Sequence, residues 1–253
     1  MVEQKTMITQ RWQKIVRLSI VTSVCVMLAV STTAARAAHS PPPVLTQNVA
    51  AKPASYQGMG LIPEATFMFR DGERNQQVHV NSFYLDLYEV TVGEFKAFLA
   101  ATGYRTSAAE QKEERLFDQT NAAGPDYPVG FVSQRDAQAY CEWSGKRLPT
   151  PHEWQLAAIG TDGRDWPWGA WVAGAANINT HAVAKPGSYP QDKSPYGVFD
   201  LGGNLLEWTT QGSLGGSYAT DWHNPRTLHR NVDDWVANTG FRCAAETPSS
   251  HKQ

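Results

Sequence analysis

Residues 161–243 constrain the fold more than any other part of the chain, because they form a long stretch without a convincing helical pattern. They hold six of the nine tryptophans and many of the glycines. Such a stretch becomes ordered through packed loops, buried indole rings and bound ions rather than through regular hydrogen-bonded ladders. Short strands and helices are predicted before it, so the sequence indicates a single α+β domain with a loop-rich C-terminal half.

The N-terminus has the pattern of a secretory signal peptide. Basic side chains precede an apolar run at residues 18–30, and Ala35 and Ala37 provide small residues for cleavage. The apolar run is too short to span a bilayer comfortably. We therefore expect residues 1–37 to be cleaved, the chain to be exported to the periplasm, and no integral membrane span to remain. The alternative is an uncleaved membrane anchor.

Composition divides the remaining chain and limits its partners. Residues 38–58 are rich in proline and predict an extended linker, residues 59–247 predict the folded domain, and residues 248–253 predict a short tail. The formal net charge is −2, and cleavage would remove five of the 22 basic and one of the 24 acidic side chains, leaving −6. Nucleic-acid binding requires a basic surface, so we expect no nucleic-acid partner.

Local signals place strands and helices before residue 161. Residues 61–69 and 78–86 are predicted strands, and the turn at residues 70–75 favours a hairpin between them. Three helices are predicted from hydroxyl-bearing N-caps and glycine stops. They begin after Thr91, Ser133 and Thr150 and end at Gly103, Gly145 and Gly160.

Ten short motifs stand in a specific order along the chain. They are 83–91 (FYLDLYEVT), 128–133 (PVGFVS), 139–143 (AYCEW), 145–150 (GKRLPT), 153–154 (EW), 166–169 (WPWG), 177–178 (NI), 197–208 (GVFDLGGNLLEW), 215–218 (GGSY) and 238–243 (NTGFRC). This series resembles the formylglycine-generating enzyme (sulfatase-modifying factor) family over about residues 61–245. The resemblance implies a loop-rich variant of the C-type-lectin fold.

The cysteines separate this chain from the catalytic members of that family. Those members bind copper(I) through two cysteines shortly after the GGSY motif, and thiolates suit this soft ion. The matching positions are Thr220 and Pro225, so the resemblance implies that copper is not bound. Cys141 and Cys243, the pair left after signal cleavage, match the family's structural disulfide. An even cysteine count in an oxidising compartment likewise usually indicates a bridge.

The turn at residues 200–207 is a candidate calcium site. Asp200 and Glu207 supply the hard carboxylate oxygens that calcium prefers. Together with the carbonyls of Gly203 and Leu205, they match a calcium site of the family one for one. The alternative is that Asp200 caps a turn and Glu207 pairs with a cation.

A second calcium site of the family would use Asn177 and the carbonyl of Ile178. The aspartate that follows them in the family is not evident in the shorter loop at residues 180–190. The resemblance therefore supports this second site less than the first.

Three further residues match positions around the family's active groove: Ser217, Asn238 and Arg242. Ser217 and Asn238 are expected to line the groove, with a bystander hydroxyl in a turn as the alternative for Ser217. Arg242 is expected to be a buried structural arginine satisfied by carbonyl groups, because a buried charge needs several acceptors.

Residues 220–234 replace the segment that carries the catalytic cysteines in the family. Trp222 and His223 are candidate groove residues, and His223, His229 and Asp233 could form a metal or acid–base centre. The alternative is a polar surface loop beside a packed indole ring.

Three functions from different classes fit these features. The first, favoured by analogy with exported relatives that finish a pyoverdine chromophore, is a protein that assists oxidative maturation without copper–cysteine chemistry. Its client would be a secreted peptide or an envelope protein. The second is a non-catalytic binding module that holds a peptide, a glycan or a partner protein. The third is residual formylglycine synthesis on sulfatases.

Overall fold

The computed structural model describes residues 56–72, 74–219 and 237–248. The expected signal peptide, most of the expected linker and the end of the tail lie outside these ranges, so what the sequence indicates about them stays a prediction. No helix within these ranges is long and apolar enough to cross a membrane.

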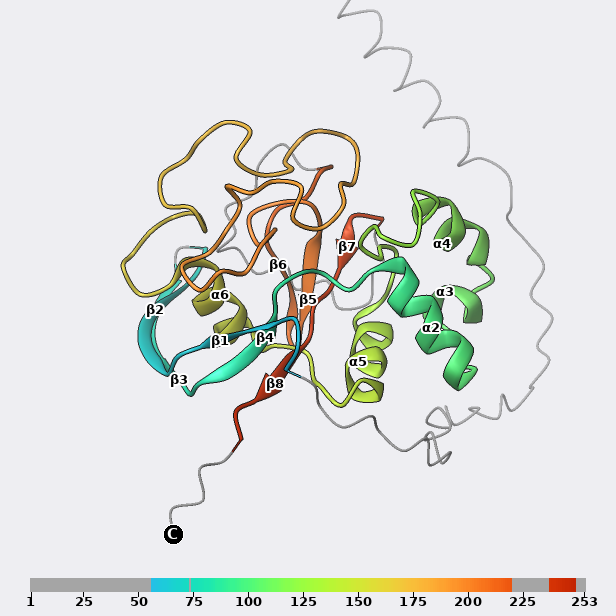
Figure 1. The fold of residues 1–253 in the computed structure, drawn as a ribbon, viewed down its shortest axis with the longest axis horizontal. Helices are drawn as coiled ribbons and strands as arrows, with labels where there is room; N and C mark the ends of the chain where they lie inside the picture. Colours follow the sequence, from blue (N-terminus) through green and yellow to red (C-terminus); the bar gives the residue numbers. More distant parts are fainter. Residues whose placement is uncertain (1–55, 73, 220–236, 249–253) are drawn as a thin grey trace, which may run out of the picture. The chain divides into compact units, whose positions relative to one another are not determined.

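Short strands and short helices make up the described chain (Figure 1). The strands are β1 (Met59–Ile62), β2 (Ala65–Asp71), β3 (Arg74–Val80), β4 (Phe83–Asp86), β5 (Leu206–Thr209), β6 (Gly212–Leu214), β7 (Thr239–Gly240) and β8 (Ala244–Glu246). The helices are α2 (Val92–Thr102), α3 (Ser107–Glu110), α4 (Glu114–Thr120), α5 (Gln134–Trp143) and α6 (Pro151–Ile159). Residues 160–219 and 237–248 contain no helix, as expected for the loop-rich half. The α+β class predicted from the sequence is confirmed.

The strands form three small sheets, and the end of the domain contributes to two of them. The strand orders are β1-β4-β8, β2-β3 and β6-β5-β7. β8 pairs antiparallel with β4, and β7 pairs parallel with β5. Residues 239–246 therefore connect the sheet built from the start of the domain with the sheet built from its loop-rich half (Figure 1).

The two long strands predicted at residues 61–69 and 78–86 are each divided in two. The first is interrupted at Pro63 and the second at Asn81 and Ser82. The predicted hairpin forms between β2 and β3, whereas β1 pairs with β4. Proline lacks the amide proton that a strand ladder requires, which explains the first break. The prediction of one continuous hairpin was therefore wrong in its pairing.

The three predicted helices are confirmed with their caps. Each begins with a capping box, in which a hydroxyl and a carboxylate bond to each other's backbone amides: Thr91 with Glu94, Ser133 with Asp136, and Thr150 with Glu153. The sequence does not predict α3 and α4. These two helices bury few apolar side chains, so they give no clear helical periodicity.

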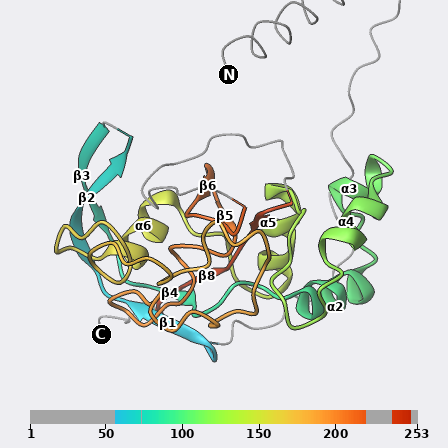
Figure 2. The same cartoon turned by 90° about the horizontal axis from the view of Figure 1, so that it is seen from above.

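Two hydrophobic clusters support the sheets. One includes Trp154 and side chains of the β2–β3 hairpin, α6 and β6. The other lies among α2, α5 and β5 and includes Phe95, Tyr140 and Phe241. Figure 2 shows the β2–β3 hairpin at one end of the domain and α2, α3 and α4 at the other. The short central strands lie between these two clusters.

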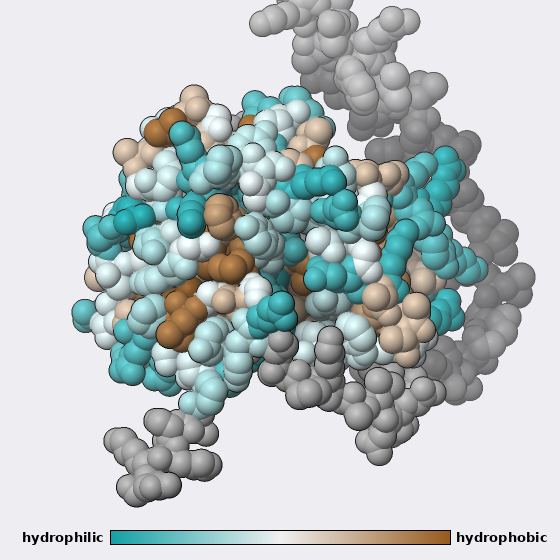
Figure 3. Space-filling model, viewed as in Figure 1, coloured by the Kyte–Doolittle hydropathy of each residue, from teal (hydrophilic) through white to brown (hydrophobic). Residues whose placement is uncertain are grey.

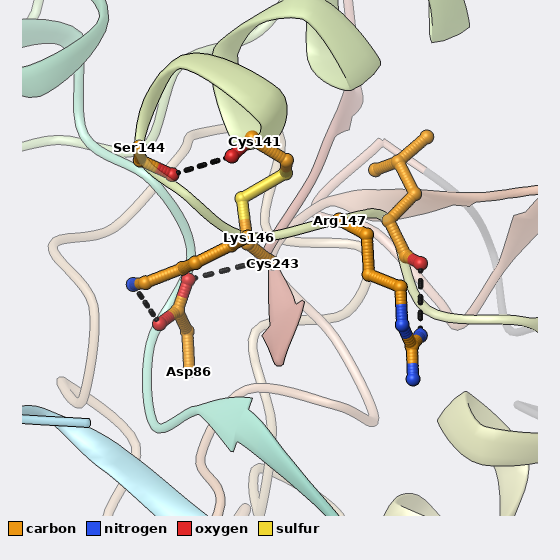
Figure 4. The surroundings of a disulfide bond; sticks show 7 residues. Asp86, Cys141, Ser144, Lys146, Arg147 and Cys243 are labelled. Carbon is orange, nitrogen blue, oxygen red and sulfur yellow. Dashed lines mark hydrogen bonds and ion pairs between the residues drawn. A yellow bond between two sulfur atoms is a disulfide. The ribbon is translucent and has the colours of Figure 1, made fainter. Parts of the chain in front are cut away.

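Cys141 and Cys243 form the expected disulfide, with Cα atoms 5.6 Å apart. The bridge joins α5 to the segment before β8 (Figure 4). Asp86 lies beside it and accepts hydrogen bonds from the Cys243 amide at 3.0 Å and from Lys146 Nζ at 2.6 Å. Closing a loop of this length stabilises a fold by about 4–5 kcal/mol in the chain-entropy account.

Candidate functional site

Ser217 and Asn238, two of the predicted groove residues, are in direct contact. Asn238 Nδ2 donates a hydrogen bond to Ser217 Oγ at 2.7 Å, and the Ala219 amide donates to the same oxygen at 3.3 Å. Ser217 is fully buried and Asn238 is half-buried. The contact joins the GGSY motif to the residue that begins the NTGFRC motif.

Backbone contacts position this pair. Asn238 accepts a hydrogen bond at its carbonyl from the Leu206 amide at 2.9 Å, next to the parallel pairing of β5 with β7. On the other side, a side chain at Gly216 would place its Cβ 2.5 Å from the carbonyl oxygen of Gly202. Only glycine fits such a close approach of two backbones. Ser217 is thus fixed by residues immediately before it in the chain, and Asn238 by β5.

The other groove candidates, Trp222 and His223, lie outside the described residues. The same holds for His229 and Asp233, and for Thr220 and Pro225 at the positions of the family's catalytic cysteines. Their proposed roles stay predictions. Of the four groove candidates, the structure therefore places two, and it places them together.

Arg242 is a buried structural arginine, as expected. Its side chain is fully buried and donates to the carbonyl oxygens of Asp86 at 3.0 Å and Phe199 at 2.8 Å. It also forms an ion pair with Glu207, with Nη2 2.6 Å from Oε1. Glu207 accepts a further bond from Trp154 Nε1 at 2.7 Å. The alternative reading of Glu207, pairing with a cation, is therefore seen in the structure.

Three more carboxylates are buried around this ion pair. Asp200 has a left-handed backbone (φ 61°) and accepts from the Gly187 amide at 2.6 Å. Asp192 accepts from the Gly202 amide at 3.0 Å. Glu89 accepts from Asn204 Nδ2 at 2.9 Å. We call Glu89, Asp192, Asp200 and Glu207 the buried carboxylate cluster.

The cluster holds four carboxyl groups against the single cation Arg242, and this excess contributes to the raised pKa values of Glu89, Asp192 and Asp200. Burial raises the pKa of Asp200 to about 6, and the charge of Glu207 acts in the same direction. Burial and the charges of Asp200 and Glu207 raise the pKa of Glu89 well above its usual value. Burial and Asp200 likewise raise the pKa of Asp192. An added cation at this place would relieve the repulsion and favour the ionised carboxylates.

The second predicted calcium segment packs against the first. The carbonyl of Asn177 accepts from the Asn204 amide at 2.9 Å, and its side-chain Nδ2 donates to Asn204 Oδ1 at 2.8 Å. Asn177 Oδ1 also accepts from the Thr180 hydroxyl. The amide of Ile178 donates to the Ala176 carbonyl at 3.0 Å. The side-chain oxygen and nitrogen of Asn177 thus already have protein partners.

The predicted calcium ligands fit a cation in part: Asp200 offers a hard oxygen, whereas the carboxylate of Glu207 is already paired with Arg242. Within the described ranges, no three His, Cys, Asp or Glu side chains are grouped as metal ligands. The first predicted site, however, relies on the carbonyls of Gly203 and Leu205 as well as on the carboxylates of Asp200 and Glu207. Asp200 Oδ2 accepts one hydrogen bond, from the Gly187 amide, and so retains a lone pair for a hard ion, whereas each oxygen of Glu207 already accepts two donors from Arg242 and Trp154. Calcium binding stays a prediction.

Sequence reasoning missed Glu89, Asp192 and Asn204. Glu89 is separated from Asn204 by 115 positions, and only the fold brings its carboxylate to the Asn204 amide. Asp192 follows the loop in which the sequence showed no acidic ligand. The one local signal is that Asn204 follows two glycines in the sequence; in the structure it has a left-handed backbone (φ 65°), which asparagine tolerates better than most residues.

Comparison with known proteins gives sequence relatives of 28% and 31% identity. "Formylglycine-generating enzyme" of Bos taurus is 28% identical, and the match covers 70% of this chain and 69% of that protein. "Inactive C-alpha-formylglycine-generating enzyme 2" of Bos taurus is 31% identical, and the match covers 70% of this chain and 81% of that protein.

Solved structures share the fold. The structure of PvdO from Pseudomonas aeruginosa superposes with a TM-score of 0.60 at 19% identity, covering 75% of this chain and 94% of PvdO. The crystal structure of CarF superposes with a TM-score of 0.57 at 18% identity, covering 75% of this chain and 98% of CarF. The predicted single-domain fold of the formylglycine-generating enzyme type is confirmed.

The family assignment rests on most of the domain. Residues 46–247 match the family described as "Sulfatase-modifying factor enzyme 1-like domain". This range contains the Ser217–Asn238 pair, the buried carboxylate cluster and the disulfide. A formylglycine-generating enzyme and an inactive relative each match 70% of the chain, and the chain belongs to the sulfatase-modifying factor family.

Proposed function

We propose that this protein is an exported member of the family that assists the oxidative maturation of a secreted peptide or an envelope enzyme, without copper–cysteine chemistry. The observation that carries the proposal is the Ser217–Asn238 contact at 2.7 Å, which joins two motifs at the predicted groove. The sequence continues from this pair into Thr220 and Pro225, which offer no thiolate. Soft metal ions are held in proteins mainly by thiolates and thioethers.

The chemistry of the pair suits a positioning role. Asn238 carries both an amide donor and a carbonyl acceptor, the same two groups that a peptide backbone presents. Because the Leu206 amide fixes the Asn238 backbone, the side chain starts from a defined position. In this proposal Asn238 and Ser217 orient the client polypeptide beside residues 220–234, and Trp222 and His223 contact it.

Export is part of the same proposal. The N-terminal sequence pattern supports it, and so does the disulfide, because such bridges persist mainly in oxidising compartments such as the periplasm. We also propose that a structural calcium ion is held by Asp200, Glu207 and the carbonyls of Gly203 and Leu205. The excess of carboxyl groups over cations in the buried carboxylate cluster supports this ion.

A non-catalytic binding module is the second candidate. It is favoured by the relative that is 31% identical and bears the name "Inactive C-alpha-formylglycine-generating enzyme 2". In that case the same groove would hold a peptide, a glycan or a protein without changing it.

The experiment compares the purified protein with the variants Asn238→Ala and Ser217→Ala on secreted peptides of the producing cell. Intact mass of the peptide and dissolved oxygen are followed together. Loss of two mass units with oxygen uptake, abolished by Asn238→Ala at unchanged melting temperature, supports maturation. Retention of a peptide at unchanged mass supports the binding module. Stoichiometric copper(I) on the protein, or an aldehyde on a co-expressed sulfatase, would overturn both.

A further inference from the structure

A polar cavity of about 570 Å³ lies away from the Ser217–Asn238 pair. Its walls come from the segment between β4 and α2, from α5, and from the loop at residues 185–186. The charged and hydroxyl-bearing side chains among its lining residues include Asp86, Glu94, Asp126, Tyr140, Lys146 and Lys185. This volume falls in the range of small-ligand sites. On the face shown in Figure 3, by contrast, hydrophobic side chains gather only in small patches.

The cavity has a net negative charge. Four carboxylates line it, those of Asp86, Glu89, Glu94 and Asp126, against the two ammonium groups of Lys146 and Lys185. Both ammonium groups are already paired. Figure 4 draws the ion pair of Lys146 with Asp86. Its Nζ–Oδ1 distance is 2.6 Å, and Lys185 Nζ lies 2.9 Å from Asp126 Oδ2. The charge of Glu94 therefore remains without a partner cation among the lining residues, whereas burial raises the pKa of Glu89 well above its usual value.

Tyr140 brings a polar group to this cavity that the fold does not use. Its side chain is only 8% exposed, and Phe95, Phe98 and Phe241 pack around its ring. Since the ring is enclosed, its hydroxyl end is the part that faces the cavity. Within the described part of the chain the hydroxyl forms no hydrogen bond, and it is not sealed from solvent.

The hydroxyl stays protonated, and Tyr140 lines the same cavity as the carboxylates of Glu94 and Asp86. Burial raises the pKa of Tyr140 above its usual value, and the charges of Glu94 and Asp86 add to this effect. A hydroxyl oxygen in a cavity that also holds carboxylates can accept a hydrogen bond from a cationic N–H donor. An ammonium group has three such donors, so it matches one hydroxyl and two carboxylates.

We propose that this cavity binds a protonated primary amine, whose ammonium group contacts the Tyr140 hydroxyl and the carboxylates of Glu94 and Asp86. The amine is carried either by a lysine side chain of a polypeptide or by a free aliphatic diamine. The half-exposed Lys185–Asp126 pair lies at the solvent side of the cavity, where exposed ion pairs contribute little and separate readily. This site is independent of the proposed maturation role.

Calorimetric titration of the purified protein tests the proposal with two probes, Nα-acetyl-lysine methylamide and 1,5-diaminopentane. The neutral analogue, acetylated at Nε as well, keeps the methylene chain of lysine but lacks the charge. At least one of the two amines should bind, and the neutral analogue should not. Tighter binding of the lysine derivative identifies a polypeptide source, and tighter binding of the diamine a small-molecule source.

Two variants locate the site. Tyr140→Phe removes only the unused hydroxyl and should weaken amine binding about tenfold, the loss of one hydrogen bond to a charged group. Glu94→Gln keeps the capping box of α2, because glutamine serves there as well, and should weaken binding about threefold. Glu142→Gln removes an equal charge from an exposed position of α5 and should leave binding unchanged.

Three outcomes would overturn the proposal. The first is that neither amine binds at millimolar concentration. The second is that the neutral analogue, acetate or phosphate binds as well as the amines. The third is that Tyr140→Phe and Glu94→Gln, with unchanged melting temperatures, bind the amines like the original protein.

Discussion

Arg242 and Glu207 form an ion pair in which both side chains are completely buried, with Nη2 2.6 Å from Oε1. Glu207 lies on β5, and Arg242 lies between β7 and β8. The pair thus connects the sheet of the loop-rich half with the segment that carries the disulfide. Breaking one side of a buried pair leaves an uncompensated charge, which costs far more than the loss of an exposed pair.

Replacing Arg242 tests the difference in cost between breaking a buried ion pair and breaking an exposed one. Arg242→Met should lower the free energy of unfolding by about 3–5 kcal/mol, because Glu207 then remains buried among three other carboxylates. The double variant Arg242→Met/Glu207→Leu should recover much of this loss. Urea unfolding followed by tryptophan fluorescence measures both. Arg135→Gln, which breaks the half-exposed pair with Glu110, serves as the control and should cost less than about 1 kcal/mol.

The pH dependence of stability should depend on calcium. Without calcium, the pKa of Asp200 is raised to about 6 in the folded protein, so the folded state binds this proton more tightly than the unfolded chain does. The resulting stability is fully present below the unfolded value and is lost as the pH rises through about 6. In chelator, the free energy of unfolding should therefore fall between pH 5 and pH 7.

Calcium should reverse this trend, because the ion requires ionised carboxylates and binds more tightly as the pH rises. Saturation at 100 times the dissociation constant adds about 2.7 kcal/mol. Unfolding curves at pH 5, 6 and 7, with chelator and with calcium, provide the measurement. Asp200→Asn should make the protein indifferent to chelator. Identical curves with and without calcium at pH 7 would contradict the calcium proposal.

Removing the disulfide should destabilise the domain without changing its fold. The double variant Cys141→Ala/Cys243→Ala should lose about 2–5 kcal/mol in urea unfolding. A reducing agent should lower the stability of the original protein and have no effect on the double variant. Alkylation followed by intact-mass analysis should label neither cysteine before reduction. Labelling of both under native, oxidising conditions is the contrary result.

The close contact at Gly216 predicts a selective effect on the groove. Gly216→Ala would place a Cβ 2.5 Å from the Gly202 carbonyl, so the backbone before Ser217 must shift. Overpacking of this kind costs about 1–3 kcal/mol, and client binding or turnover should be lost as well. Gly174→Ala is the control, because its Cβ meets open space and only its left-handed backbone (φ 76°) is strained. Equal effects of both variants on the client would contradict the groove assignment.

Helix ends were predictable because their signals are local. Thr91, Ser133 and Thr150 each bond to backbone within the next three residues, and such contacts survive in any tertiary context. Strand pairing was less predictable. β1 and β2 look like one strand in the sequence, yet they pair with different partners, and that choice is made by long-range packing.

The candidate site shows the same contrast between residues that the sequence indicated and residues that only the fold reveals. Motif order was sufficient to indicate Ser217, Asn238, Arg242 and the disulfide, because these positions stand in fixed places in the family. The roles of Glu89 and Asp192 were not readable, since an isolated acidic residue gives no indication of burial. Their raised pKa values arise from neighbours that are distant in sequence.

The two short strands β7 and β8 have a consequence for biogenesis. They fill the open sides of β5 and β4, and the eight residues that contain them also hold Arg242 and Cys243. Until this stretch has been synthesised, one edge of β5 and one edge of β4 therefore remain unpaired. Truncation just before residue 239 would remove β7, β8 and Cys243, so that two sheets would remain incomplete and the disulfide could not form.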